Sequence, residues 1–289
     1  MNILITGGTG FIGKALTKRL LDEGNTLLFT TRENDPDNKS INLAHSTHHE
    51  VTSFFERHQI DGIIHLASLV LVTHSPDDIK NLIESNITFP TLLLEAAREA
   101  KIKWFINTGT FWQHYNNEEY NPVNLYAATK QAFEDILKYY SEISTIQFLT
   151  LEVSDTFGPD DTRGKIFNKW MNAKNSNEEI NMSPGNQMID ILYIDDVIDA
   201  FRHSIDRLQN NKNKLEKFSL YSRKPISLRE VSATFDTVFN SQLKINWGKL
   251  PYREREVMQT WSKGLSLPGW KPKKTFDQGC EEIKKLIKS

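Results

Sequence analysis

Short apolar runs alternate with longer amphipathic stretches through the first half of the chain. Residues 3–5 and 62–67 are compact and mostly apolar, which predicts strands buried on both faces. Residues 11–22 repeat leucine and alanine at helical spacing, which predicts an amphipathic helix. The pattern predicts further strands at residues 26–30 and 104–106 and further helices at residues 49–58, 85–101 and 125–140. This alternation indicates a parallel sheet with helices on both faces.

The pattern changes in the second half of the chain, where glycine, proline and asparagine become frequent. The strongest strand signal there, residues 189–193, precedes a helix that begins near Asp195. We therefore predict an α/β protein, with a Rossmann-like doubly wound parallel sheet in residues 1–158 and a smaller C-terminal substrate domain in most of residues 159–289. Residues 187–222 are expected to be an exception, because this segment returns to the sheet domain and forms part of it.

A glycine motif lies between the first predicted strand and the first predicted helix. Its spacing, GxxGxxG, is a variant of the dinucleotide fingerprint, whose glycines allow a tight turn, close approach of the pyrophosphate and close packing of helix on strand. The N-terminus of the helix then faces the phosphates. A glycine-rich turn with a purely structural role is the alternative. The cofactor-binding residues predicted in this motif are Gly7, Thr9, Gly10, Phe11, Ile12 and Gly13.

The end of the second predicted strand bears on the choice of cofactor. An acidic residue about 20 positions past the glycines usually holds the ribose of NAD, whereas an arginine suits the 2′-phosphate of NADP. The chain has Arg32 there, followed by Glu33. We therefore predict NADPH as the cofactor, with NAD held by Glu33 as the alternative. The alternative without a cofactor contact is that Arg32 is an exposed loop residue that binds nothing.

Tyr126 and Lys130 are the predicted catalytic pair, and they are also predicted to contact the cofactor. Residues four positions apart on a helix share one face, so the ammonium can approach the phenol. A cation stabilises the phenolate, and we therefore expect Lys130 to lower the pKa of Tyr126 below its usual value of about 10. Such a phenol exchanges a proton more readily near neutrality. The alternative is a half-buried tyrosine beside a solvated lysine.

Two threonines follow the strand predicted at residues 104–106. Ligands bind at the carboxyl ends of parallel strands, and a hydroxyl there is suited to hold a substrate carbonyl against the tyrosine. We predict Thr108 for this catalytic and substrate-binding role, with Thr110 as the second choice. The alternative is that each threonine only ends a strand.

Composition narrows the class of partner. The chain has 35 basic and 37 acidic residues, a formal net charge of −2, and so lacks the basic excess that nucleic-acid or anionic-membrane binding requires. Its longest apolar stretch, residues 63–72, is much shorter than the roughly 20 residues that span a bilayer. Cys280 is the only cysteine, and residues 1–6 do not resemble a signal peptide. A cytoplasmic protein without a nucleic-acid or membrane partner is expected.

Together these motifs resemble the extended short-chain dehydrogenase/reductase family of sugar-nucleotide epimerases, dehydratases and reductases. Their order and spacing match the family through most of the chain. The matching segments are residues 6–13, His65-Leu66-Ala67, Thr108, Tyr126 with Lys130, Phe157-Gly158-Pro159 and Gly269-Trp270-Lys271-Pro272.

The resemblance implies a role for each matching residue. Tyr126 exchanges the proton at the reacting oxygen, Lys130 holds the nicotinamide ribose, and Thr108 polarises the carbonyl. A nucleotide-sugar substrate and a homodimer are also implied. The resemblance adds Leu66, Ala67 and Asn86 to the cofactor-binding residues, although a helix cap is an equal interpretation of Asn86.

Within the family, some segments look most like CDP-abequose and CDP-paratose synthases, which are NADPH-dependent reductases of 4-keto-6-deoxysugars. These segments are residues 81–86, 185–196, 253–258 and 269–272. The likeness implies that Arg253 binds the nucleotide diphosphate. Two positions depart from the family: Ile189 stands where arginine is usual, and residues 152–155 replace a segment that often carries arginine and asparagine or histidine.

The favoured function is therefore an NADPH-dependent reductase of a nucleotide-linked 4-keto-6-deoxysugar. The alternatives are an NAD-dependent sugar-nucleotide epimerase or dehydratase and a non-catalytic NADP-binding sensor. No Asp-Glu pair follows Thr108, which speaks against a dehydratase. We expect no metal site at residues 48–50, a core position for His65, and caps at Asp195 and Asp196. Whether Trp112 and His114 contact the sugar or the base of the substrate stays an open question.

Overall fold

The computed structural model describes residues 1–31, 39–176 and 178–288. Its centre is a seven-stranded parallel sheet in the order β11-β6-β5-β4-β1-β2-β3. The strands are β1 Asn2–Thr6, β2 Thr26–Thr30, β3 Ser40–Ile41, β4 Gly62–His65, β5 Trp104–Thr110, β6 Gln147–Val153 and β11 Leu215–Leu220. The chain winds outward from β1 in both directions, which confirms the predicted Rossmann-like α/β class.

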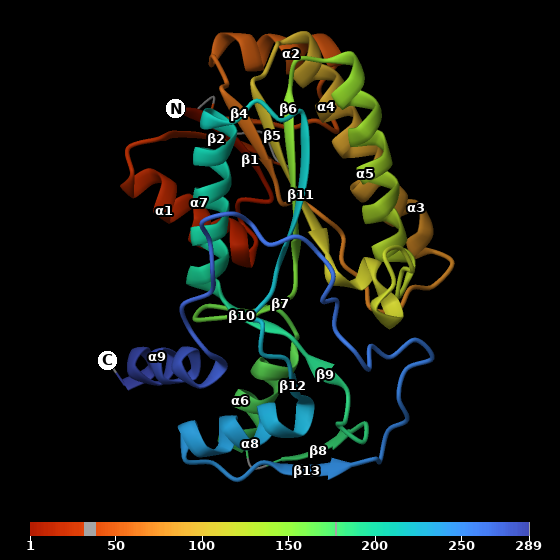
Figure 1. Cartoon of the computed structure of the whole chain (residues 1–289), viewed down its shortest axis with the longest axis vertical. Helices are drawn as coiled ribbons and strands as arrows, with labels where there is room; N and C mark the ends of the chain where they lie inside the picture. The colour runs from red at the N-terminus through yellow and green to blue at the C-terminus, as the bar shows by residue number, and fades with distance from the viewer. Residues whose placement is uncertain (32–38, 177, 289) are drawn as a thin grey trace.

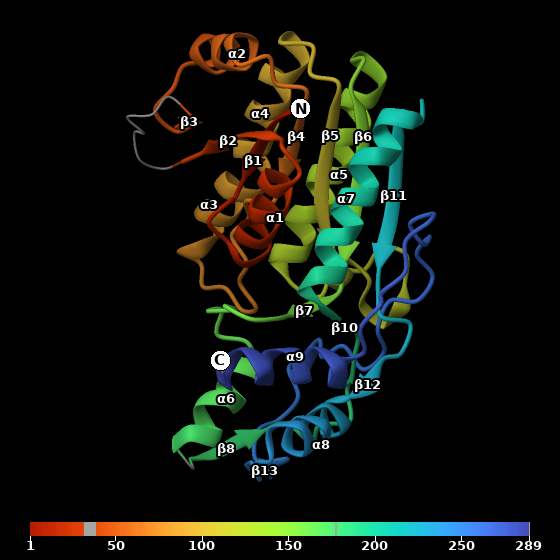
Figure 2. The ribbon, with the colours of Figure 1, turned by 90° about the vertical axis from the view of Figure 1, so that its left-hand side faces the viewer.

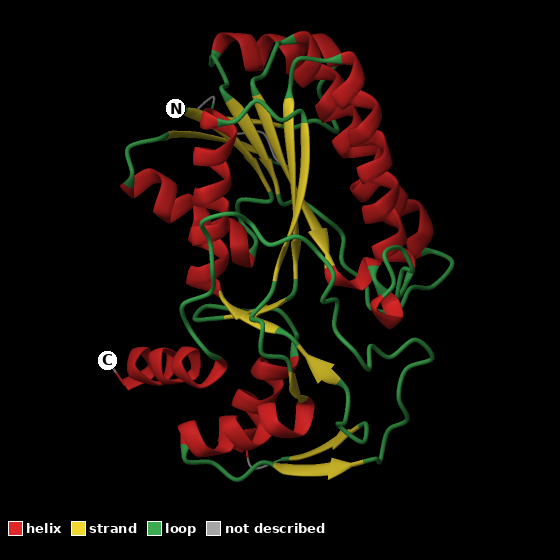
Figure 3. Ribbon diagram, in the orientation of Figure 1, coloured by secondary structure: helices red, strands yellow, loops and turns green. Residues whose placement is uncertain are grey.

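Helices cover both faces of this sheet (Figures 1 and 3). Strand β1 shows why the sequence pattern was continuous: Ile3 and Ile5 belong to one hydrophobic core, Leu4 belongs to the other, and all three are fully buried. Successive strand side chains point to opposite faces, so a strand covered on both sides has no polar face. One face carries α1 Phe11–Asp22 and α7 Ile194–Asn210; the other carries α2 His48–Arg57, α4 Phe89–Glu99 and α5 Leu125–Ile143.

A smaller lobe lies below the sheet in the view of Figure 1. In the described residues it contains three two-stranded sheets, with the pairs β7–β10, β9–β12 and β8–β13. Its elements are β7 Asp155–Phe157, α6 Ile166–Ser176, β8 Glu179–Met182, β9 Met188–Ile189, β10 Ile191–Tyr193, β12 Ile226–Ser227, α8 Leu228–Phe239, β13 Lys244–Trp247 and α9 Phe276–Lys288. Cys280, on α9, is fully buried in its core. The segment expected to return, residues 187–222, includes α7, which packs on α1, and β11, which pairs with β6.

Residues 248–275 run between the lobes without a helix or strand, and we call them the C-terminal strap (Figure 2). The strap docks on the start of α7, where the Trp270 indole donates to the carbonyl of Asp196 at 2.9 Å. The Asp196 carboxylate accepts the backbone N–H groups of Lys273 at 2.9 Å and Lys274 at 3.0 Å. Asp196 therefore holds the strap and does not cap α7, contrary to our expectation.

Two predicted elements differ in the structure. The helix predicted at residues 85–101 continues from α3 Asp78–Ile83 through a π-helical segment, η1 Glu84–Thr88, into α4. The strand predicted at residues 189–193 divides at Asp190, whose buried carboxylate accepts the backbone N–H of Ser222 at 2.6 Å. Across the described residues, no helix combines the length and apolarity that a membrane-spanning segment needs.

Candidate active site

The glycine motif forms the turn between β1 and α1. Gly7 has a φ of +70°, and a Cβ there would stand 2.7 Å from the backbone nitrogen of Ala67. A Cβ at Gly13 would stand 2.1 Å from the carbonyl oxygen of Gly7, so only glycine permits the close crossing. No side chain caps the first turn of α1 at Gly10, which leaves its backbone N–H groups available for an anion. This turn fits a dinucleotide pyrophosphate, while Arg32 lies outside the described residues.

Thr6 fixes the chain where β4 ends beside this turn. Its oxygen accepts the N–H groups of Leu66 at 3.1 Å and Ala67 at 3.0 Å and lies 2.8 Å from Nδ1 of His65. Because those two N–H groups use the acceptor capacity of the oxygen, the Thr6 hydroxyl donates to Nδ1 and His65 is neutral. Burial, assisted by the charge of Lys130, lowers the pKa of His65 well below its usual range. His65 is thus a core residue that positions Leu66 and Ala67 beside the glycine turn.

Tyr126 and Lys130 lie in the first turns of α5. Asn124 caps this helix through its Oδ1, which accepts the backbone N–H of Ala127 at 3.0 Å. The same side chain donates to two carbonyls of the loop that follows β4, at 3.2 and 3.0 Å. One asparagine therefore starts the helix and ties it to that loop. Tyr126 and Lys130 are both buried, one helical turn apart.

The Tyr126 phenol is held in its neutral form. Burial raises the pKa of Tyr126 to about 12, although hydrogen bonds with Thr110 and Ser68 oppose the rise. The expected lowering of this pKa by Lys130 is wrong, because the loss of hydration outweighs the favourable contacts. The Trp112 ring packs edge-on against the phenol, with 6.4 Å between ring centroids. Tyr126 therefore has the protonation state of a proton donor.

Lys130 is a buried cation. Burial lowers the pKa of its ammonium to about 8, and the carboxylate of Glu134, one turn further along α5, opposes the fall. Among the described residues, no carboxylate forms an ion pair with this ammonium. A buried charge without a protein partner is typical of a group that binds ligand hydroxyls or phosphates.

The two threonines of β5 differ in their surroundings. The Thr108 hydroxyl donates to the carbonyl of His65 at 3.0 Å, whereas the Thr110 side chain lies near the Tyr126 phenol and acts to lower its pKa. Both threonines project from the same face of β5, but Thr110 is the last residue of the strand. The geometry therefore favours Thr110 over our first choice, Thr108, as the neighbour of Tyr126. The preference for Thr108 followed from ending the predicted strand at Ile106, and a longer predicted strand would have favoured Thr110.

Asn86 is buried, and its side-chain amide is hydrogen-bonded within the protein and does not cap a helix. Its Oδ1 accepts from the Ser68 hydroxyl at 3.0 Å and from the Leu69 N–H at 2.8 Å. Its Nδ2 donates to the Leu69 carbonyl and to the Thr129 hydroxyl, both at 3.0 Å. All hydrogen-bonding capacity of the amide is therefore used within the protein. Asn86 instead positions Ser68, a residue that the sequence analysis missed, beside Tyr126.

The C-terminal strap brings Arg253 to the same region. Its guanidinium lies 5.6 Å from the Trp112 ring and pairs with Glu256 through Nε at 3.0 Å. Nearby, burial acts to raise the pKa of Asp155, but the charges of Lys165 and other cations hold that pKa below its usual range. Arg253 and Lys165 are among the cations whose charges lower the pKa of Asp155, so this acidic side chain lies among positive charges.

His114 is unavailable to a substrate, contrary to one of the interpretations left open. It is fully buried, with Nε2 at 2.7 Å from a carboxylate oxygen of Glu152 and Nδ1 at 3.0 Å from the carbonyl of Glu118. Within the described residues, no cluster of three or more His, Cys, Asp or Glu side chains is arranged to hold a metal ion.

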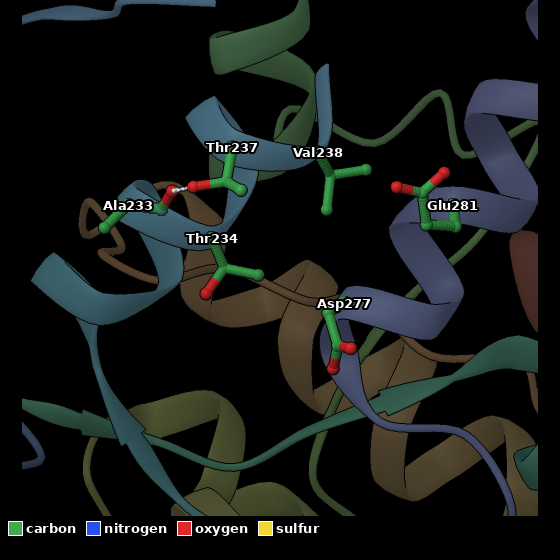
Figure 4. Close-up of a pocket in the computed structure, with 6 residues that line it drawn as sticks. All are labelled: Ala233, Thr234, Thr237, Val238, Asp277 and Glu281. Carbon is green, nitrogen blue, oxygen red and sulfur yellow. Dashed lines mark hydrogen bonds between the residues drawn. The ribbon is translucent and has the colours of Figure 1, made fainter. Parts of the chain in front are cut away.

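A separate cavity of about 380 Å³ lies between α8 and α9 (Figure 4). Four of its lining residues come from α8 and two from α9, and the Thr237 hydroxyl donates to the carbonyl of Ala233 at 2.9 Å. The lining residues are Ala233, Thr234, Thr237, Val238, Asp277 and Glu281. This acidic lining does not suit a nucleotide phosphate, and the cavity contains none of the predicted site residues.

The chain belongs to the NAD dependent epimerase/dehydratase family, whose profile matches residues 3–216. It is similar to a CDP-abequose synthase of Yersinia pseudotuberculosis, at 28% identity over 89% of this chain and 91% of that protein. A CDP-abequose synthase of Salmonella typhimurium is 26% identical over 99% of this chain and 98% of its own length.

Solved structures share the fold along the whole chain. A UDP-glucuronic acid 4-epimerase from Bacillus cereus, in complex with UDP-glucuronic acid and NAD, superposes with a TM-score of 0.85 at 20% identity, covering 99% of this chain and 100% of that one. A UDP-glucose 4-epimerase from Thermotoga maritima, with UDP-glucose, gives 0.84 at 20% identity, and each chain is fully covered.

Proposed function

We propose that this protein is an NADPH-dependent reductase of a nucleotide-linked 4-keto-6-deoxysugar. The observation that carries the proposal is the neutral Tyr126 phenol, which lies near Thr110 and Ser68 and one helical turn from the buried Lys130. A reductase needs a protonated group at the reacting oxygen, and burial of Tyr126 supplies one. The similarity to CDP-abequose synthases supports the substrate class.

The proposed reaction adds a hydride and a proton across the C4 carbonyl of the sugar. Bound NADPH supplies the hydride. Tyr126 donates its proton to the C4 oxygen, which becomes a hydroxyl, and the resulting phenolate is reprotonated from solvent. Thr110 donates a hydrogen bond to the same oxygen and holds it against the phenol. Lys130 binds the ribose hydroxyls beside the nicotinamide.

The rest of the substrate is proposed to lie along Trp112. This ring lies 6.4 Å from the Tyr126 ring and 5.6 Å from the Arg253 guanidinium. A sugar whose C4 oxygen meets Tyr126 would therefore rest near the indole, with its diphosphate close to Arg253. Arginine suits that role because its planar donors form charge-assisted bonds with phosphate oxygens.

The preference for NADPH over NAD is proposed from Arg32. Replacing it in Arg32→Ala should weaken NADPH binding much more than NADH binding, because only NADPH has a 2′-phosphate. Titration of the free protein with each reduced cofactor measures this difference. Equal losses for the two cofactors would contradict the assignment.

An NAD-dependent 4-epimerase is the second candidate, since solved structures of the same fold include 4-epimerases, one of them in complex with NAD. An epimerase recycles its hydride and retains its cofactor through purification. Mass spectrometry of the denatured, freshly purified protein separates the two functions: retained NAD favours the epimerase, and exchangeable NADPH favours the reductase.

The variant Tyr126→Phe tests the mechanism. It should bind NADPH like the wild type but lower kcat by about 10² to 10⁴, the usual contribution of a general acid. NADPH oxidation with CDP-, UDP- and dTDP-linked 4-keto-6-deoxysugars gives the rates. A variant with nearly wild-type turnover would show that Tyr126 is not the proton donor.

A further inference from the structure

Four ionisable side chains form a charge network behind the active-site strand β5. Its members are His114, Glu134, Glu152 and Lys217. His114 and Glu152 are buried, Glu134 is nearly so, and Lys217 is exposed at the surface. The proposed reaction uses none of them directly. The Lys217 ammonium lies 3.1 Å from Glu152 Oε1 and 3.3 Å from Glu134 Oε2. The Glu152 carboxylate in turn lies 2.7 Å from Nε2 of His114. The network joins α5, β6, β11 and the turn after β5.

His114 is joined to the network through both ring nitrogens. Its Nδ1 lies 3.0 Å from the carbonyl of Glu118, and its Nε2 lies 2.7 Å from a carboxylate oxygen of Glu152. Burial acts to raise the pKa of Glu152, but the contacts with His114 and Lys217 outweigh it and hold this pKa below its usual value. The two carboxyl groups differ in this respect, because burial raises the pKa of Glu134 although Lys217 and Gln113 oppose the rise.

One route leads from this network to the active-site threonine. Gln113 is fully buried, and its Nε2 donates to Glu134 Oε1 at 2.9 Å. The Gln113 carbonyl oxygen accepts the backbone N–H of Thr110 at 2.9 Å. A Cβ at Gly109 would stand 3.0 Å from Glu134 Oε1, so β5 passes directly over the carboxylate. Gln131 Oε1 accepts from the same Nε2 at 3.0 Å, so Glu134 and Gln131 together fix which end of the Gln113 amide faces Thr110.

We propose that this charge network is a positioning element of this enzyme, in which Glu134 holds Thr110 in place through Gln113. Lys217 and the His114–Glu152 pair hold Glu134 in turn. The catalytic consequence rests on the proposed function of Thr110 and Tyr126. The network also accounts for the departure from the family at Glu152: an acidic residue is tolerated there because His114 and Lys217 neutralise it.

Three variants of α5 test the proposal. Glu134→Ala removes one of the two acceptors of the Gln113 amide and should lower kcat by about 10- to 100-fold, since small misplacements of a reacting group cost that much. The KM for NADPH should not change. Glu134→Gln should recover most of the loss, because its amide oxygen still accepts from Gln113. Asp135→Asn, which removes the same charge from the next, exposed residue, is the matched control and should behave like the wild type.

Amide hydrogen exchange in the free protein provides a readout that does not depend on the reaction. The Thr110 amide should exchange faster in Glu134→Ala than in Asp135→Asn or the wild type. The reason is that Gln113, which accepts this N–H, no longer has its hydrogen bond to Glu134. If Glu134→Ala does not fold, Gln113→Met breaks the same route without changing the charge. Unchanged exchange at Thr110, or a kcat of the Ala variant equal to that of Asp135→Asn, would overturn the proposal. If the wild type reduces no keto sugar, the proposed function is refuted. The exchange rate of the Thr110 amide still decides whether Glu134 positions Thr110.

Discussion

Thr108 and Thr110 have the same side chain on the same face of β5 but different surroundings. The Thr108 hydroxyl donates a hydrogen bond to the carbonyl of His65, whereas the Thr110 side chain lies near the Tyr126 phenol. We expect Thr110→Val to lower kcat/KM for the keto substrate by about 10²-fold or more, as for a lost oxyanion donor. Thr108→Val should leave turnover nearly unchanged and lower the free energy of unfolding by about 1 kcal/mol, the net value of one hydrogen bond.

Steady-state kinetics and urea unfolding of the two valine variants check this assignment. The two substitutions are chemically identical and two positions apart, so each is the control of the other. A larger loss of turnover in Thr108→Val would restore Thr108 as the substrate ligand.

Lys130 should set the alkaline limit of cofactor use. Its pKa is lowered to about 8 by burial, so the cationic form that binds ribose hydroxyls is lost as the pH rises through that value. The kcat/KM for NADPH, which reports the free enzyme, should therefore fall about tenfold per pH unit above pH 8. Lys130→Met should bind NADPH weakly, and its kcat/KM for NADPH should not show this fall above pH 8. A wild-type profile that stays flat to pH 10 would contradict the assignment.

At the scale of single residues, the sequence predicted those features that depend on local spacing. Gly7 and Gly13 stand where a Cβ would clash, and Tyr126 and Lys130 share a helix face, as expected. The role of Asn86 was not predictable, because saturation of its amide depends on partners 17 and 43 positions away. The raised pKa of Tyr126 likewise depends on burial, which the spacing does not report.

Among the secondary-structure elements, strands with short, mostly apolar runs were predicted, whereas β6, which has two buried polar residues, was missed. Strand β6, Gln147–Val153, contains Thr150 and Glu152, and both are buried in the structure. A buried glutamate is a poor strand signal unless its partners are known, and the partners of Glu152 come from other elements. The π-helical segment η1 was also missed, since one extra residue in a helix leaves no clear periodic signal.

In the whole molecule, the division into a sheet lobe and a smaller lobe was expected, but the path of the C-terminal strap was not. The strap is fixed by contacts distant in sequence, such as the stacking of Trp261 on His114 with centroids 3.9 Å apart. Trp270 and Asp196 join it to α7. Such contacts follow from the assembled fold and leave no periodic pattern in the chain.

Asp196 should contribute measurably to the stability of this arrangement. Asp196→Ala leaves two backbone N–H groups of the strap without acceptors, which should cost about 1–3 kcal/mol. For a chain of this size, each kcal/mol lowers Tm by about 2–4 °C. Asp195→Ala is the control, because Asp195 is exposed and pairs only with Lys274 at 3.3 Å. Equal melting temperatures for the two variants, measured by calorimetry, would show that the strap is held elsewhere.

The burial of Cys280 provides a natural probe of motion. It is the only cysteine of the chain, it lies fully inside the smaller lobe, and burial raises the pKa of its thiol. A thiol reagent therefore reacts only while α9 is detached, and each chain gives a single signal. The labelling rate counts these openings without an engineered tag. Comparing that rate with and without NADPH tells whether a ligand of the sheet lobe slows the opening of the other lobe.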